Sequence, residues 1–178
     1  MRQDLLFCLF LVVFSLSGCD NSTRAPSETN WAEAGFDKTG TYFKVAAPNA
    51  AHGPTRLVYV PVYSRLFLAK ASFWEMAASL SIRNTDPDQT LIVHEINYID
   101  TAGDVIEHYL ETPHQLDPMA TATLTLPQWD ERGGTGANFL VRWSGESGIN
   151  TPIIEAVMAG TRGTQSFSFV RAGQEVNE

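Results

Sequence analysis

A regular alternation of apolar residues with polar or small ones runs through the middle of the chain. Its apolar positions are Trp74, Met76, Ala78, Leu80 and Ile82. This period of two is typical of a strand with one buried and one wetter face. Turn-forming residues at 84–88 end the segment, a β-branched run covers 91–99, and a second turn at 101–104 leads into 105–110. Three strands joined by turn signals predict an antiparallel meander.

The same short-strand pattern continues on both sides of this stretch. Further strands are predicted at 57–63, 120–126, 139–143, 153–158 and 166–170. Because Pro61 cannot donate to a strand ladder, the first of these is expected at a sheet edge or with a bulge. The pattern at 64–73 is ambiguous and allows a helical turn at 66–70. About eight short strands are typical of an all-β, antiparallel immunoglobulin-like β-sandwich, and a small β-barrel is the alternative.

The chain divides into four parts. Residues 1–18 have the composition of a signal peptide, and 19–55 are rich in polar and small residues, which predicts a flexible tether. The predicted β-sandwich domain covers 56–172, and 173–178 form a tail. The apolar run 5–16 is too short to cross a bilayer as a helix of about 20 residues.

Leu16, Ser17, Gly18 and Cys19 close this apolar run. The tetrapeptide resembles the lipobox of bacterial lipoproteins, in which an aliphatic residue and two small residues precede a cysteine. The resemblance implies that Cys19 is acylated and anchors the chain to a membrane through an N-terminal lipid. The alternative is an ordinary signal peptide with a chance cysteine. Asp20 follows, and in enteric bacteria an aspartate there tends to retain a lipoprotein in the inner membrane, on its periplasmic face.

Charge and cysteine content narrow the function further. The net charge is −8, from 12 basic and 20 acidic side chains. No basic stripe interrupts this balance, which argues against a nucleic-acid partner. The two cysteines are Cys8, in the signal segment, and Cys19, in the lipobox, so the predicted domain has no thiol for a disulfide. The domain therefore has to be stabilised by apolar burial, and its length suffices for one core.

The turn after the first predicted strand contains two candidate ligands. Asp86 and Asp88 carry the oxygen atoms that calcium prefers. Aspartates in a turn also accept hydrogen bonds from their own backbone, so a structural role is the simpler interpretation. Glu107 and His108 have metal-binding side chains, but alternation along a strand places them on opposite faces. We therefore predict no metal and no cofactor.

Two further candidates are polar residues within predicted strands. His94 and Glu155 share strand parity with apolar neighbours, so each is a candidate polar group on a buried face, where it must be paired. Exposure at a strand end is the alternative for both. A buried Glu155 would need Arg162 or Arg142 as its partner, and such a pair is more often structural than catalytic.

Three other segments carry a family resemblance. They are 81–87 (SIRNTDP), 133–139 (GGTGANF) and 155–163 (EAVMAGTRG). These segments resemble parts of a bacterial lipoprotein family that is known only as a domain of unknown function. The similarity covers roughly 59–169, and it implies neither an activity nor a functional residue.

Taken together, these features favour a membrane-anchored envelope lipoprotein that is a non-enzymatic interaction or scaffold module. We expect a protein partner in the cell envelope, bound through loops or an edge strand. Fold alone does not establish a function, because function resides in sites. The alternative is a periplasmic lipoprotein that binds a small ligand or a metal, which a deep pocket with converging His, Glu or Asp would favour.

Overall fold

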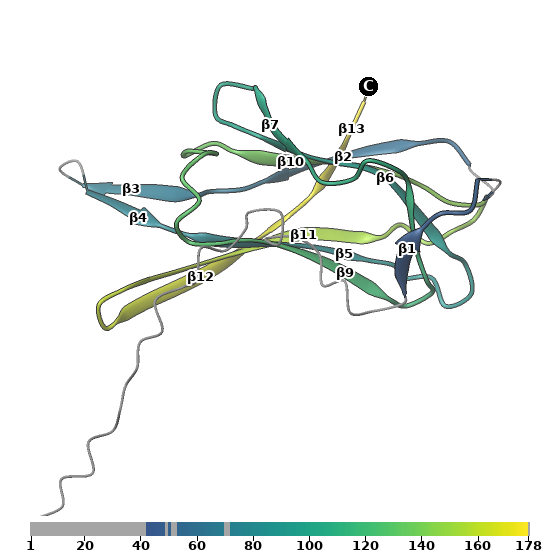
Figure 1. The fold of residues 1–178 in the computed structure, drawn as a ribbon. Helices are drawn as coiled ribbons and strands as arrows, with labels where there is room; N and C mark the ends of the chain where they lie inside the picture. Colours follow the sequence, from purple (N-terminus) through teal and green to yellow (C-terminus); the bar gives the residue numbers. More distant parts are fainter. Residues whose placement is uncertain (1–41, 49, 51–52, 70–71, 178) are drawn as a thin grey trace, which may run out of the picture.

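Strands are the regular elements in the part of the chain that the structure describes. The computed structural model describes residues 42–48, 50, 53–69 and 72–177. Its strands form two main sheets and one small hairpin (Figure 1). All pairings between neighbouring strands are antiparallel.

Within the described residues, the larger sheet has seven strands and the smaller sheet has four. The larger sheet contains, in spatial order, β1 (Phe43–Val45), β8 (His114–Leu116), β6 (Leu91–Ile99), β10 (Asn138–Ser144), β2 (Arg56–Pro61) and β13 (Gln174–Val176), with β7 (Val105–His108) beside β6. The smaller sheet contains β12 (Gln165–Ala172), β11 (Ile153–Arg162), β5 (Ala77–Arg83) and β9 (Thr121–Leu126). A separate pair, here called the hairpin arm, consists of β3 (Arg65–Ala69) and β4 (Ser72–Glu75).

The two main sheets face each other as the layers of a sandwich (Figure 1). Side chains from both sheets form one hydrophobic core. Leu80 of β5 and Phe139 and Trp143 of β10 are almost fully removed from solvent. The predicted all-β sandwich is confirmed, and no sheet of the described residues closes into the alternative barrel.

The alternation from 74 to 82 identifies the inward residues correctly but not the continuity of the strand. Met76 and Ile82 are buried as predicted, although Ser81 on the opposite face is buried too. The strand is interrupted at Met76, whose amide donates a 2.8 Å hydrogen bond to the carbonyl of Ser64. This interruption separates β4, in the hairpin arm, from β5. The helical turn allowed at 66–70 is wrong, because β3 is a strand.

The predicted meander is wrong in one of its two connections. β6 and β7 pair as expected, but β5 and β6 belong to different sheets. Buried Asn84 fixes the connection between them to a distant segment of the chain. Its Nδ2 donates to the carbonyl oxygens of Gln89, Leu116 and Asp117, at 2.8, 3.2 and 3.1 Å. The chain therefore crosses from one layer to the other instead of turning back on itself.

β2 has partners on both sides, whereas Pro61 predicted an edge strand or a bulge. β10 pairs with β2 up to Pro61, and β13 pairs with Leu57, Val58 and Tyr59. Pro61 is the last residue of β2 and lies beyond the end of β13. Its lack of an N–H is therefore tolerated in a strand that is central over its first half.

Two short strands lie outside the predicted domain bounds of 56–172. β1 and β13 form opposite ends of the larger sheet. The chain passes from β12 in the smaller sheet to β13 in the larger one through Gly173, whose amide donates a 2.7 Å hydrogen bond to the carbonyl of Ile154. A Cβ on this glycine would lie 2.6 Å from Cγ1 of Val58. Glycine thus allows the close approach that the change of sheet requires.

Candidate functional site

Large exposed apolar side chains gather on the hairpin arm, which extends beyond one end of the sandwich (Figure 1). Phe67, Leu68 and Phe73 are 59, 54 and 43 % exposed. Phe67 and Phe73 are opposite each other in the two strands, with ring centroids 5.4 Å apart. Single exposed apolar residues are common, but a group of them marks a candidate interaction surface.

The arm is attached to the smaller sheet. Trp74 packs edge-on against Phe167 of β12, with ring centroids 5.0 Å apart. Arg162, at the end of β11, donates a 2.9 Å hydrogen bond from Nη1 to Ser72 Oγ. These contacts involve two of the four residues of β4, so they fix the arm to the sandwich.

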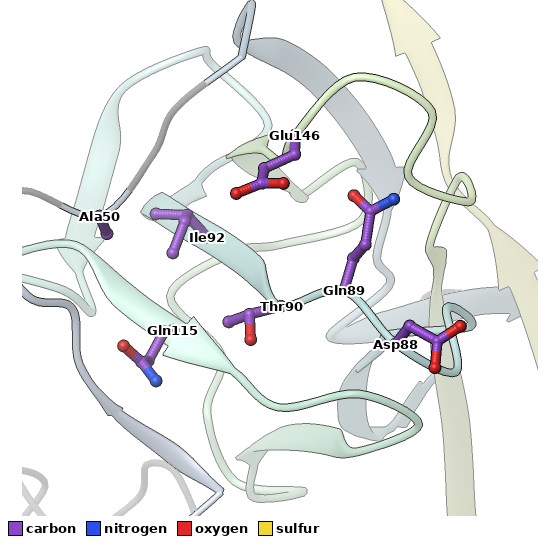
Figure 2. A pocket seen from close by; sticks show the side chains of 7 residues that line it. All are labelled: Ala50, Asp88, Gln89, Thr90, Ile92, Gln115 and Glu146. Carbon is purple, nitrogen blue, oxygen red and sulfur yellow. The ribbon is translucent and has the colours of Figure 1, made fainter.

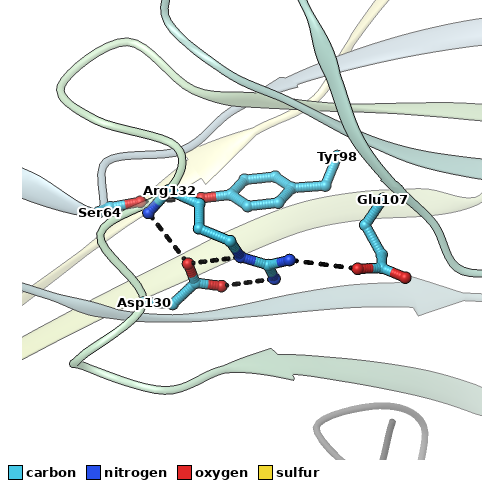
Figure 3. A network of polar contacts seen from close by, with 5 residues as sticks. All are labelled: Ser64, Tyr98, Glu107, Asp130 and Arg132. Carbon is cyan, nitrogen blue, oxygen red and sulfur yellow. Dashed lines mark hydrogen bonds and ion pairs between the residues drawn. The ribbon is translucent and has the colours of Figure 1, made fainter. Parts of the chain in front are cut away.

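A network of polar contacts holds the loop beside the arm (Figure 3). Arg132 donates from Nε and Nη2 to the two carboxylate oxygens of buried Asp130, at 3.0 and 2.9 Å. Its Nη1 also donates to Glu107 at 3.2 Å. The hydrogen bonds to Asp130 are the largest cause that raises the pKa of Arg132. Because arginine stays protonated, this bidentate pair positions the loop and supplies no acid or base.

Tyr98 supports the same loop from the core. Its hydroxyl shares a 2.8 Å hydrogen bond with the hydroxyl of Ser64 (Figure 3). Burial raises the pKa of Tyr98, and the hydrogen bond with Ser64 partly opposes that shift. A Cβ at Gly133 would collide with the tyrosine hydroxyl. The pair therefore explains why the loop needs a glycine at this point, and we interpret it as structural.

An open hollow of about 470 Å³ follows this loop and is lined by Trp129, Asp130, Glu131 and Arg132. Trp129 is exposed. Arg65 of β3 connects this loop to the arm, since its Nη1 lies 3.8 Å from Oε2 of Glu131 and its guanidinium lies 5.2 Å from the ring centre of Phe73. The arm and this hollow are therefore neighbouring parts of one surface.

A second hollow, of about 280 Å³, contains mainly polar side chains (Figure 2). Its lining residues are Ala50, Asp88, Gln89, Thr90, Ile92, Gln115 and Glu146. Figure 2 shows the carboxylate of Glu146 above Ile92, whereas the carboxylate of Asp88 points away from the other side chains. Gln89 Oε1 is buried and has no hydrogen-bond partner among the described residues. Among the described residues, no three His, Cys, Asp or Glu side chains are placed to hold a metal ion.

The hydrogen bonds of Asp86 fit the turn interpretation better than the calcium alternative. Its Oδ1 accepts from the amides of Asp88 and Gln89 at 3.0 and 2.8 Å, and its Oδ2 accepts from the amide of Asn150 at 2.9 Å. These bonds, that of Asn150 foremost, hold the pKa of Asp86 below its usual value. Both carboxylate oxygens are thus occupied by backbone donors.

β6 has a bulge at His94 that changes the parity of the strand. Arg142 and Trp143, consecutive residues of β10, pair with Glu95 and Val93, so His94 is the extra residue of the bulge. The core residues of β6 are Leu91, Val93, Ile96 and Tyr98. A bulge inserts one extra residue and so reverses the alternation beyond it. His94 is therefore not on the buried face, and its Nε2 lies 2.8 Å from Ser144 Oγ.

Glu155 lies on the outer face of β11, whose buried residues have the opposite parity. They are Ile154, Ala156 and Met158. Oε1 of Glu155 pairs with Nε of Arg83 in β5 at 3.4 Å, so the predicted partners Arg162 and Arg142 are both wrong. Arg142 instead pairs with Glu95. The sequence pattern missed Arg83 because a contact between neighbouring strands leaves no local signal.

The predicted lipid site lies elsewhere in the chain. Cys19 is outside the described residues, so its acylation stays a prediction. Within the part of the chain that the structure does describe, no helix has the length and apolar character needed to cross a membrane.

Fold and surface together define an all-β sandwich with a projecting apolar hairpin. The chain belongs to the family described as a protein of unknown function (DUF3124), whose sequence profile matches residues 55–176. This confirms the resemblance to a domain of unknown function, and the lipoprotein part of that resemblance stays a prediction. No curated protein matches the sequence. A similar solved chain is that of the crystal structure of Thermotoga maritima 1070, with 12% identity, 71% of this chain and 95% of that chain covered, and a TM-score of 0.40.

Proposed function

We propose that this protein is a lipid-anchored, non-enzymatic binding module of the bacterial cell envelope, and that it contacts a protein partner through the hairpin arm. The observation that carries the proposal is the joint exposure of Phe67, Leu68 and Phe73 on a hairpin that is firmly attached to the sandwich. The lipobox supports the anchor, and Asp20 supports a position on the periplasmic face of the inner membrane.

Physical chemistry supports a binding role for this surface. Complete burial of one large apolar side chain is worth about 1.5 to 3 kcal/mol, and the three arm residues are each roughly half exposed. A partner that covers them would regain a large part of that free energy. Because Trp74 and Ser72 already fix the arm, little conformational freedom remains to be lost on binding.

The second candidate function is the binding of a small polar ligand in the hollow beneath Glu146. The specific observation in its favour is Gln89 Oε1, a buried acceptor without a partner in the described part of the chain. A ligand with hydrogen-bond donors would suit this lining. If a bound ligand donates a hydrogen bond to Gln89, Gln89→Met should weaken ligand binding. The ligand should then stabilise the protein less. If no ligand binds, the same variant should be as stable as wild type or more so.

Site-specific photocrosslinking in cells tests the arm. A photoreactive residue at position 67 or 73 of the full-length protein should give one discrete adduct, and the same residue at exposed Thr125 of β9 should give none. Phe67→Ser combined with Phe73→Ser should remove the adduct formed from position 68 without changing the amount of protein. Equal adducts at 67 and 125, or an undiminished adduct at 68, would contradict the proposal.

Acyl labelling tests the anchor separately. Cys19→Ser should abolish incorporation of labelled fatty acid and release the chain from membranes, whereas Cys8→Ser should leave both unchanged. Asp20→Ser should move the protein to the outer membrane in density gradients of an enteric host. Continued incorporation of labelled fatty acid into the Cys19→Ser variant would contradict the anchor hypothesis.

A further inference from the structure

We propose that the free edge of β12 binds an extended, acidic segment of a partner protein, which adds to the smaller sheet as a further strand. This inference rests on the proposed function as a binding module, but it concerns a different surface from the exposed face of the hairpin arm. Among the residues that the structure describes, β12 ends the strand order β12-β11-β5-β9, so only one of its two edges is paired with another described strand (Figure 1).

The register shows which backbone groups point to the open edge. The eight residues of β12 pair with β11 without a break. In an antiparallel ladder, alternate residues of a strand bond to the neighbour. The amide of Gly173 bonds to the carbonyl of Ile154, so the ladder to β11 uses the odd-numbered residues. The open edge is formed by the N–H and C=O groups of Ser166, Ser168, Val170 and Ala172.

β12 lacks the features that usually prevent a strand edge from pairing. At the other edges of the two main sheets in the described structure, β1 and β13 have three residues each, β7 has four, and β9 is followed at once by Pro127. β12 has no proline and no bulge, and its one charged residue, Arg171, is near its end. All its residues except Phe167 and Phe169 are exposed. A long open edge of this kind is a template for another strand.

The inner face of β12 offers an apolar wall for the added side chains. Phe169 lies 5.8 Å from Tyr63, and Phe167 lies 5.0 Å from Trp74, measured between ring centroids. The rings of Phe167 and Phe169 are stacked, with centroids 6.3 Å apart. A further strand would direct every second side chain to this face, where cross-strand neighbours of the two phenylalanines gain apolar contact.

The charge around β12 favours an acidic segment over a second copy of the chain. Residues 156–174 include Arg162 and Arg171 but no Asp or Glu, in a protein whose net charge is −8. The two arginines lie near opposite ends of β12. An antiparallel second copy would bring its Arg171 toward Arg162, whereas a segment with an acidic residue at each end would meet both cations. The nearest carboxylate in the ladder, Glu155, is already paired with Arg83.

Amide hydrogen exchange followed by NMR tests this assignment. The protein is the chain from residue 20 onward, which keeps the whole described structure, and the probes are peptides selected for binding to it from a random dodecapeptide library. The selected peptides should carry Asp or Glu near both ends. Saturation with them should slow exchange of the amides of Ser166, Ser168, Val170 and Ala172 by at least about tenfold. The odd-numbered amides are protected already, so they should change little.

Matched variants separate edge pairing from general binding. Ser168→Pro removes an N–H of the open edge without removing a bond to β11, so affinity for the peptides should fall at least about tenfold. Ser168→Ala keeps that N–H and should bind like wild type. Arg171→Glu should weaken the same peptides roughly threefold, since one attractive contact becomes repulsive. Arg162 is left unchanged because it holds the hairpin arm through Ser72. If Ser168→Pro fails to fold, two N-methylated peptides replace it, one methylated on the odd-numbered and one on the even-numbered amides. Only one of these two sets of amides points to β12, so only one peptide should lose binding.

Each alternative occupant has a distinct outcome. In the absence of peptide, the even-numbered amides could become more protected as protein concentration rises. That result would identify a second copy as the occupant and overturn the proposal. Protection confined to β9 or to the hairpin arm would overturn it as well. If position 67 crosslinks in cells but the β12 edge never gains protection, this inference fails alone. If the edge is protected but the arm never crosslinks, the proposed use of the arm fails instead.

Discussion

Gly160→Ala should loosen the attachment of the hairpin arm. β4 passes so close to β11 that a Cβ on Gly160 would lie 2.7 Å from the carbonyl oxygen of Glu75, 2.7 Å from Met76 Sδ and 2.8 Å from Trp74 Cδ1. Ordinary carbon contacts are about 3.5 to 4.0 Å long. All three neighbours therefore have to retreat by roughly 1 Å.

The backbone contact decides the expected magnitude. Overpacking usually costs about 1 to 3 kcal/mol. The methionine side chain can rotate away, but the carbonyl of Glu75 can retreat only if β4 moves. We therefore expect a loss of about 2 to 3 kcal/mol in the free energy of unfolding. This corresponds to a fall in Tm of roughly 4 to 12 °C.

Urea and thermal unfolding of Gly160→Ala would measure this loss. Gly136→Ala, measured in the same way, is the control. A Cβ on Gly136 would meet Thr101 Cγ2 at 3.4 Å, and the residue has no left-handed backbone, so its change should stay within about 0.5 kcal/mol. A Gly160→Ala variant as stable as wild type would refute the close approach of β4 and β11. Equal losses in the two variants would attribute the effect to glycine replacement in general.

Three further predictions concern stability. Leu80→Ala should cost about 2 to 5 kcal/mol in urea unfolding because Leu80 is fully buried. Ser81→Ala removes a buried hydroxyl that has no partner among the described residues and should cost nothing, so equal losses would contradict this prediction. Met119→Gly should raise Tm, because Met119 is 67% exposed at a φ of 58°, and a lower Tm would refute the strain. The lowered pKa of Asp86 stabilises the fold above about pH 4, and this contribution is lost as pH falls through the folded-state pKa. Asp86→Asn should therefore flatten the acid limb of the pH–stability profile, and an unchanged limb would contradict the assignment.

Local alternation predicted the core residues but not the strand partners. Met76, Leu80 and Ile82 are inward because a strand repeats every two residues, which any short window of sequence reveals. Whether β5 pairs with β6 or with β9 and β11 depends on contacts over long sequence distances, such as those of Asn84 with the segment that ends β8. No local pattern reports such contacts.

The candidate surface escaped prediction for a related reason. The hairpin arm has apolar residues on both faces, since Trp74 packs on the sandwich while Phe67 and Phe73 stay in water. A strand that is apolar on both faces loses its period of two, so segment 64–73 had no clear pattern. Departures from the period-two pattern are expected where a strand uses one face for packing and the other for binding a partner. At His94, one extra residue had a similar effect, because it reversed the parity of the strand.

The pairing of β13 with β2 has a consequence for the order in which the domain folds during export. If the chain is exported as proposed, it leaves the translocation pore with its N-terminus first, so β2 emerges early. The partner of Leu57, Val58 and Tyr59 emerges only with residues 174–176, after almost all of the domain. The β11–β12 hairpin joins neighbouring segments and can form at once. The pairing of β13 with β2 instead closes a loop of nearly the whole domain and is slow. During that interval one edge of β2 is unpaired, so a chaperone of the envelope that covers it would prevent wrong strand pairing.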